Sequence, residues 1–199
     1  MLPHIDLTKV RKVMSYKKNH LKDYLKLLEW VQTTDVAQNK NFQELYKDFW
    51  ITMYGKKPVK LSDAWYISYF QFMEDKKNSP FTFEDVLRHL LPHDNRVEAS
   101  FSSKLLATVN PNQPIWGTRV FCAIKEFGIT QPLSQTDKPK QILETVATYS
   151  AIENWYSEYL NTPNATEIIR LVDEMFPFAT EMTAVKKVDW ALYSMGAKR

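Results

Sequence analysis

Glycine is scarce in this chain, and that scarcity is the feature that most limits what it can fold into. Only 4 of the 199 residues are glycine, and the sequence has no pattern of short alternating segments separated by glycine turns. All-β folds and doubly wound α/β folds both rely on such turn signals. The apolar residues instead recur at intervals of three and four. We therefore predict an all-α, multi-helix globular protein.

The clearest helical pattern covers residues 21–31, where the apolar positions form one stripe and the lysines lie outside it. The same spacing, read with capping residues, glycines and prolines, predicts nine helices. They are about 21–31, 42–54, 62–76, 82–91, 100–110, 117–124, 140–160, 165–176 and 184–195. We expect Pro92 and Thr162-Pro163 to end the helices before them, Gly55 to follow the end of helix 42–54, and residues 129–139 to be the longest loop.

The length favours a single all-helical domain, residues 1–199. Charge is spread unevenly along it, because residues 1–60 carry 12 Lys and Arg against 6 Asp and Glu, whereas the remainder carries 14 against 17. Such asymmetry is typical both of a phosphate-facing surface and of a solvated helix face. We therefore also consider two lobes, a basic one at 1–80 and a second at 81–199.

No targeting or membrane segment is evident. No apolar run approaches the roughly 18 residues that a membrane span requires, and the N-terminus lacks the pattern of a signal peptide. We expect a cytoplasmic protein without membrane partners. The single cysteine, Cys122, lies among apolar neighbours, so we expect a small buried side chain and no disulfide.

Several common chemistries lack their signatures. The sequence contains no glycine-rich phosphate loop and no GxSxG motif. Asp85, His89 and His93 are spaced four apart, which would place them on one face of an ideal helix. We expect Pro92 to turn the chain before His93, however, and no Cys pair or second His cluster completes a ligand set. We predict no metal and no cofactor.

The segment Ser100–Val120 is the strongest candidate for a functional site. Two amphipathic helices flank a connection stiffened by Pro111 and Pro114, an arrangement that predicts an αα-hairpin. We expect Lys104 of the first helix and Arg119 of the second to converge on one groove and bind phosphate.

Ser103 and Thr118 are the polar residues beside these two cations, so the predicted phosphate contacts are Ser103, Lys104, Thr118 and Arg119. Trp116 is the aromatic residue of the connection. Its ring either wedges against a base or covers the core.

Three stretches, SFSSKLL at 100–106, Asn110-Pro111 and PIWGTRV at 114–120, resemble uncharacterised bacterial proteins related to the helix-hairpin-helix DNA glycosylase superfamily. The late segment VKKVDWAL at 185–192 resembles the C-terminal helix of that group. The resemblance implies a helical fold in which a hairpin grips one DNA strand and a following aspartate assists removal of a flipped base.

The chain departs from that pattern at two places. Gly117 stands where the catalytic aspartate would be, and residues 95–99 contain no glycine for a hairpin turn that approaches phosphate closely. Asp94, Glu98 and Glu126 are the nearest other acids. Asp189 reads as a surface or capping partner of Lys186 or Lys187.

Three functions remain open from the sequence. The first is a non-catalytic, glycosylase-like protein that binds nucleic acid phosphates through the 100–120 hairpin. The second is an active DNA glycosylase or lyase whose catalytic group has moved, with Lys104 or Glu98 as candidates. The third is a structural or protein-interaction module that does not touch nucleic acid. The sequence leaves the oligomeric state open.

Overall fold

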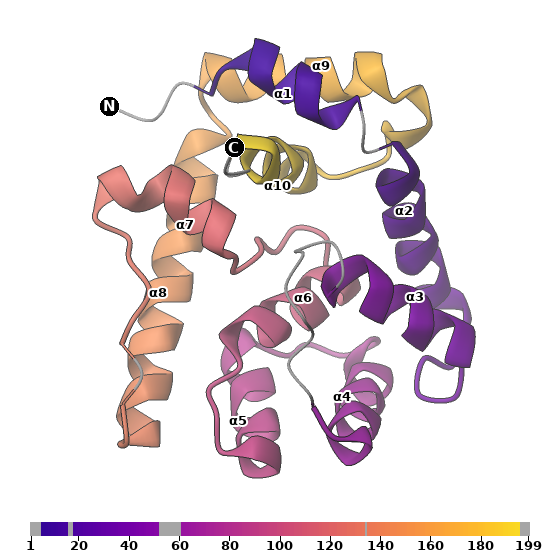
Figure 1. Ribbon diagram of the computed structural model, residues 1–199, viewed down its shortest axis with the longest axis vertical. Coiled ribbons are helices and arrows are strands. Elements are labelled where there is room, and N and C mark those ends of the chain that lie inside the picture. Colours follow the sequence, from indigo (N-terminus) through magenta and orange to yellow (C-terminus); the bar gives the residue numbers. More distant parts are fainter. Residues whose placement is uncertain (1–4, 16–17, 52–60, 134, 196–199) are drawn as a thin grey trace. The chain divides into compact units, whose positions relative to one another are not determined.

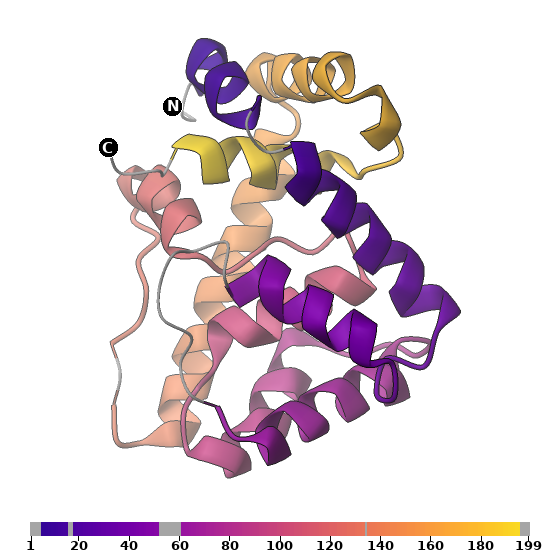
Figure 2. The same cartoon turned by 45° about the vertical axis from the view of Figure 1, so that its right-hand side comes forward.

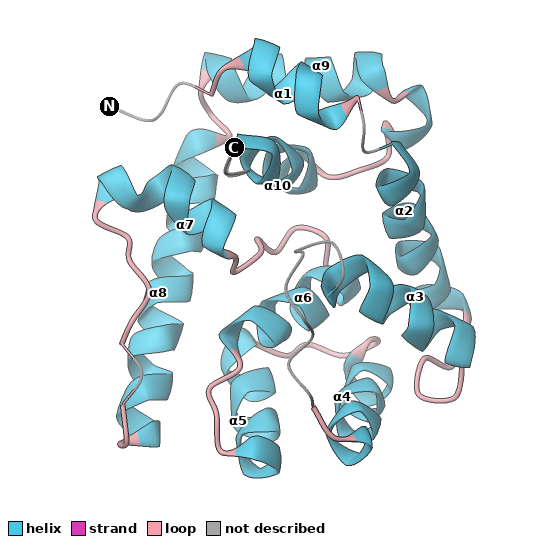
Figure 3. Cartoon of the chain, viewed as in Figure 1, coloured by secondary structure: helices cyan, strands magenta, loops and turns pink. Residues whose placement is uncertain are grey.

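The computed structural model describes residues 5–15, 18–51, 61–133 and 135–195, and all regular structure in these ranges is helical (Figure 3). The predicted all-α class is confirmed. The α-helices are α1 (Leu7–Met14), α2 (Lys18–Thr33), α3 (Lys40–Ile51), α4 (Asp63–Lys76), α5 (Phe83–Asp94), α6 (Ala99–Val109), α7 (Thr118–Ile124), α8 (Lys138–Tyr159), α9 (Pro163–Met175) and α10 (Ala184–Met195). Two 3-10 turns, η2 (Lys125–Phe127) and η3 (Pro177–Ala179), follow α7 and α9. The end predicted near Gly55 lies outside the described residues.

Helix α1 is the helix that the sequence pattern missed. It has only eight residues, and a helix this short is marginal in isolation. The Asp6 carboxylate caps it by accepting from the Thr8 N–H at 2.9 Å. Val10 and Met14 are buried, and the helix lies against α9 and α10 (Figures 1 and 2). Tertiary packing rather than local propensity therefore stabilises α1.

Helix α5 corrects the expectation that Pro92 would end it. The helix passes through Pro92 and ends at Asp94. A proline this close to the C-terminus removes one backbone donor from the last turns only. Asn95 then adopts the left-handed conformation, with φ 55°, and its N–H donates to the Leu91 carbonyl at 2.9 Å. The consequence is that His93 stays on the helix.

Proline also begins a helix rather than only breaking one. α8 ends at Tyr159, and α9 starts at Pro163, two residues before the predicted start. Thr162 is the N-cap, and its hydroxyl accepts from the Ala165 N–H at 3.2 Å. Proline suits this first position because its missing N–H would have no partner within the helix.

The chain forms two compact units. The first unit contains residues 1–18 and 110–199, and the second contains residues 19–109. In the first unit α10 packs against α1, α7 and α9, and in the second α5 packs against α4 and α6. These boundaries differ from the lobes 1–80 and 81–199 considered from the sequence. The boundary at Val109–Asn110 separates the two helices of the predicted hairpin, so the packing of α6 on α7 stays a prediction.

Aromatic side chains build the core of the second unit. Trp65 stacks on Tyr69 with ring centroids 5.0 Å apart, and Tyr46 packs edge to face on Phe70. The hydroxyl of Tyr69 donates to the Phe101 carbonyl at 2.9 Å and bonds to the hydroxyl of Tyr46 at 2.6 Å. These buried hydroxyls are thus satisfied within the core.

Two further sequence expectations concern the burial of Cys122 and the lack of a membrane span. Cys122 is exposed, so the prediction of a buried thiol was wrong. Val120, Phe121 and Ile124 form the buried face of α7, which directs Cys122 to the opposite side. Among the described residues, no helix combines the length and the apolar character needed to cross a membrane.

Candidate functional site

The connection between α6 and α7 is held through its backbone carbonyls. In the first unit, Thr183 donates its hydroxyl to the Pro111 carbonyl at 2.6 Å. Lys186 Nζ donates to the Gln113 carbonyl at 2.6 Å, and the Tyr149 hydroxyl donates to the Pro114 carbonyl at 2.9 Å. Because each of these carbonyls has a side-chain donor, the connection has one defined path.

A buried ionic network supports this anchoring. Lys186 pairs with the carboxylate of Asp189, and the Tyr156 hydroxyl donates to the other oxygen of the same carboxylate. Burial lowers the pKa of Lys186, and the charge of Asp189 opposes that shift. The predicted pairing of Asp189 with Lys186 is confirmed. Its predicted place on the helix surface was wrong, because both side chains are buried.

Arg119 is fixed at the start of α7. Its guanidinium carbon lies 3.8 Å from the centroid of the Tyr193 ring, and its Nη1 donates to the Tyr193 carbonyl at 2.9 Å. The aromatic face and the carbonyl together hold the cation in one orientation. Thr118, the preceding residue, is exposed, and Arg119 is half-buried. Gly117, the residue in the position of the glycosylase aspartate, is the N-cap of α7 and makes no side-chain cap.

Ser103 and Lys104 lie inside the second unit rather than on its surface. The Ser103 side chain is fully buried and donates its hydroxyl to the Ser100 carbonyl at 3.1 Å. Lys104 is 7% exposed, with Nζ 5.1 Å from the centroid of the Phe101 ring. Burial lowers the pKa of Lys104 to about 8, and the charge of Glu98 opposes this.

Glu98 is one of the acids considered as a relocated catalytic group. It pairs with Arg96 at 2.7 Å, and Arg96 also pairs with Asp94 at 3.1 Å. Burial raises the pKa of Glu98, and the charge of Arg96 opposes the shift. The three residues thus form a local ion-pair cluster just before α6. The side chain of Glu126 lies outside what the structure describes.

Trp116 belongs to the core. It is 6% exposed and packs edge to face on Phe121, with ring centroids 4.9 Å apart. Of the two alternatives weighed for this ring, covering the core agrees with its burial. The convergence of Lys104 and Arg119 stays a prediction, because Lys104 belongs to the second unit and Arg119 to the first.

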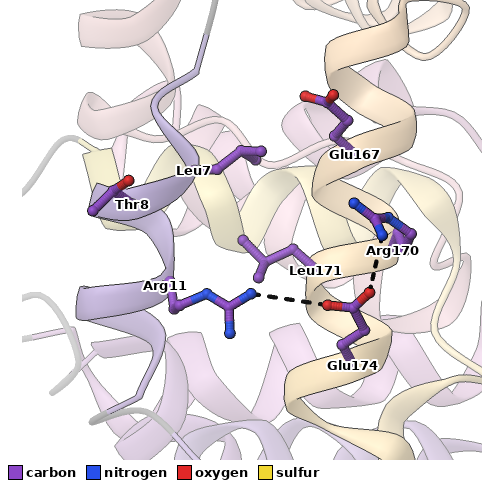
Figure 4. Close-up of a pocket in the computed structure, with 7 residues that line it drawn as sticks. All are labelled: Leu7, Thr8, Arg11, Glu167, Arg170, Leu171 and Glu174. Atoms are coloured by element: carbon purple, nitrogen blue, oxygen red, sulfur yellow. Dashed lines mark ion pairs between the residues drawn. The ribbon is translucent and has the colours of Figure 1, made fainter.

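A pocket between α1 and α9 is lined by none of the predicted site residues (Figure 4). Arg11 and Arg170 both pair with Glu174, at 3.8 and 3.3 Å. Figure 4 shows the two guanidinium groups meeting on this one carboxylate. Because the lining also includes Glu167, two acids balance the two positive charges, and this pocket is a weak attractor for a phosphate.

The sequence reading missed the anchors of the connection, namely Tyr149, Thr183 and Lys186. One signal for Lys186 and Asp189 was present. α10 has almost no polar face, because its apolar residues include Val185, Val188 and residues 190–192. Charged residues among them are therefore expected to be buried in pairs.

No family model, no curated protein and no solved structure matches this chain.

Proposed function

We propose that this chain is a non-catalytic, glycosylase-like protein that binds nucleic acid phosphates weakly through Thr118 and Arg119. The observation that supports the proposal is the anchoring of the connection before them. Side chains of α8 and α10, with Thr183 just before α10, hold the carbonyls of Pro111, Gln113 and Pro114. The backbone that carries Thr118 and Arg119 is therefore ordered in advance, which lowers the entropic cost of binding.

The burial of the other predicted contacts narrows the proposed interface. Ser103, Lys104 and Trp116 are all buried, which leaves Thr118 and Arg119 as the predicted residues with exposed surface. Arg119 offers a planar, permanently charged donor group for phosphate oxygens. A contact set this small favours weak binding that is independent of sequence and sensitive to salt.

Binding of a fluorescent DNA duplex, measured over a range of salt concentrations, tests this function. The expected log-log slope is about −0.9 for each phosphate neutralised. Arg119→Ala is expected to weaken binding and to reduce the slope by about 0.9. The matched control is Lys125→Ala, which removes an exposed cation from η2 of the same unit.

Equal loss of affinity in both variants would show that net charge alone attracts the DNA. Absence of binding at low salt would favour the protein-interaction module. A melting curve of Arg119→Ala is needed beside the binding data, because its guanidinium also contacts Tyr193.

The pKa of Lys104 favours a second candidate, the lyase activity. An amine with a pKa of about 8 is partly neutral near neutral pH and is then a nucleophile toward an aldehyde. In this candidate the Lys104 amine attacks the sugar aldehyde of an abasic site and forms an imine with loss of water.

Borohydride reduces such an imine to a stable amine and so traps the protein on the DNA. Trapping by the natural protein, but not by Lys104→Met, would support the lyase. Lys40→Met, which removes an exposed lysine of the same unit, is the control and should still be trapped. If the natural protein formed no trapped adduct, the lyase activity would be excluded.

A further inference from the structure

His89 and His93 direct the same ring nitrogen to one point in the second unit. The Nε2 atoms of both rings lie 2.8 Å from the hydroxyl oxygen of Ser68, which belongs to α4. The two ring centroids are 5.7 Å apart. We refer to Ser68, His89 and His93 as the histidine pair site.

The path of α5 produces this convergence. His89 and His93 are four residues apart, and side chains with that spacing lie one above the other on a helix. The sequence analysis expected Pro92 to turn the chain and separate them. Because the helix continues to Asp94, both rings remain on the face that packs against α4.

The hydrogen-bonding rules constrain the protons at the site. A serine hydroxyl has one proton, so Ser68 can donate to only one of the two nitrogens. The other ring must then donate its own Nε2 proton to the hydroxyl oxygen. Two neutral imidazoles therefore adopt different tautomers here, and at least one presents an Nε2 lone pair.

The surroundings hold one ring in place and leave the other open to solvent. His89 packs on Phe72 with ring centroids 4.5 Å apart. His93 is exposed, so solvent reaches the site. Neutral imidazole is the form that binds metal ions.

We propose that the histidine pair site binds a late first-row divalent metal ion through Nε2 of His89 and of His93. Imidazole suits Cu²⁺, Ni²⁺ and Zn²⁺, and among them Cu²⁺ is expected to bind most tightly. The ion replaces the Ser68 hydroxyl between the two nitrogens. This proposal departs from the sequence-based expectation of no metal, which depended on Pro92 ending the helix and on the lack of further ligands to complete a set.

The number of protein ligands decides how readily a metal ion at this site exchanges. Within the described ranges, no group of three or more His, Cys, Asp or Glu residues is placed to hold a metal ion. Water must therefore complete the coordination. Such a site is exchangeable, in contrast to a closed structural zinc site with four protein ligands.

Titration of the full-length protein with CuSO₄ tests the proposal. Isothermal calorimetry in a non-chelating buffer gives the stoichiometry, and electron paramagnetic resonance reports the nitrogen ligands of Cu²⁺. We expect one equivalent of Cu²⁺ bound through two imidazole nitrogens. His93→Ala should weaken it at least about tenfold, since loss of even a supporting partner of a ligand has that effect.

His93 is a suitable first variant because it is exposed, so its replacement leaves the core intact. His89→Asn should weaken copper binding to a similar extent, and the double variant should abolish the two-nitrogen signal. The matched control, His20→Ala, removes a histidine of α2 and should leave the affinity unchanged. Binding that is unchanged in His93→Ala, or lost equally in His20→Ala, would overturn the proposal.

Discussion

Lys186 in the first unit and Lys104 in the second are buried to nearly the same extent, yet their surroundings differ. Lys186 is 2% exposed and Lys104 is 7% exposed. Lys186 contacts the carboxylate of Asp189 and donates to the Gln113 carbonyl. Lys104 lies against the ring of Phe101, and its pKa falls to about 8.

The difference separates two uses of a buried amine. A lysine that is paired with a carboxylate and donates to a backbone carbonyl acts as a structural element, because these partners oppose the lowering of its pKa by burial. At Lys104 burial lowers the pKa to about 8, so the amine gives up its proton at mildly alkaline pH. The first arrangement supports the connection before α7, and the second makes Lys104 a candidate for chemistry.

Asp189→Asn is expected to cause the largest loss in the free energy of unfolding. The substitution leaves the Lys186 charge buried without its carboxylate, a change that typically costs about 3–5 kcal/mol. Urea denaturation at pH 7 measures the loss in the free energy of unfolding. Glu158→Gln, which neutralises an exposed acid on α8, is the control and should stay within about 0.5 kcal/mol.

A double variant, Lys186→Met with Asp189→Leu, sharpens this test. It removes both charges, so it should be less destabilised than Asp189→Asn alone. If the single variant were as stable as the natural protein, the ionic network would not be the support of the connection.

Lys104→Met is expected to stabilise the protein at neutral pH. The folded pKa of about 8 lies below the unfolded value of 10.5, so between these values the unfolded state binds the extra proton. The free energy of unfolding therefore rises with pH through this window and is lowest below it. At pH 7 the methionine variant avoids a penalty on the order of 3 kcal/mol.

Urea denaturation at pH 7, 8, 9 and 10 measures the difference between Lys104→Met and the natural protein. The difference should shrink as the pH rises. Lys40→Met, on an exposed position of α3, should show no such trend. A difference that is constant with pH would mean that methionine packs better and that the lysine is not desolvated.

Tyr149→Phe tests one of the hydrogen bonds that anchor the connection, and its expected loss of stability is smaller. The variant removes the hydroxyl that donates to the buried Pro114 carbonyl, and such a loss typically costs about 0.5–1.5 kcal/mol. Thermal unfolding gives the change, with Ser150→Ala at the next, exposed position as control. Faster hydrogen exchange at residues 112–116 would show that the connection itself has loosened, and unchanged exchange would contradict the anchoring role.

Local patterns predicted the helices that carry long amphipathic stripes. The stripe read from the sequence in α2 contained positions 21, 24, 25, 28 and 31. Leu21, Tyr24 and Val31 are buried as expected, whereas Leu27 is fully buried in place of Leu28. α1 was missed because eight residues give too little periodicity, and its stability comes from α9 and α10. The prediction that Pro92 ends its helix was wrong because a proline in the last turns does not have to end a helix. Asn95 caps the C-terminus of α5 instead.

Contacts between distant segments were beyond the reach of such patterns. The bonds that hold Pro111 and Gln113 come from residues 72 and 73 positions away. The two nitrogens at Ser68 come from a neighbouring helix 21 and 25 positions away. In both places the residue types were visible in the sequence, but only the packing of helices brought them together.

Cys122→Ser is expected to change the stability of the protein least. It tests the face of α7 opposite the buried residues. Because the thiol is exposed, the change should alter the free energy of unfolding by no more than about 0.5 kcal/mol. The native protein should react with an aromatic disulfide reagent about as fast as the urea-unfolded chain. A thiol protected in the native state would place Cys122 in the core and would rotate α7, and with it the proposed contacts of Thr118 and Arg119.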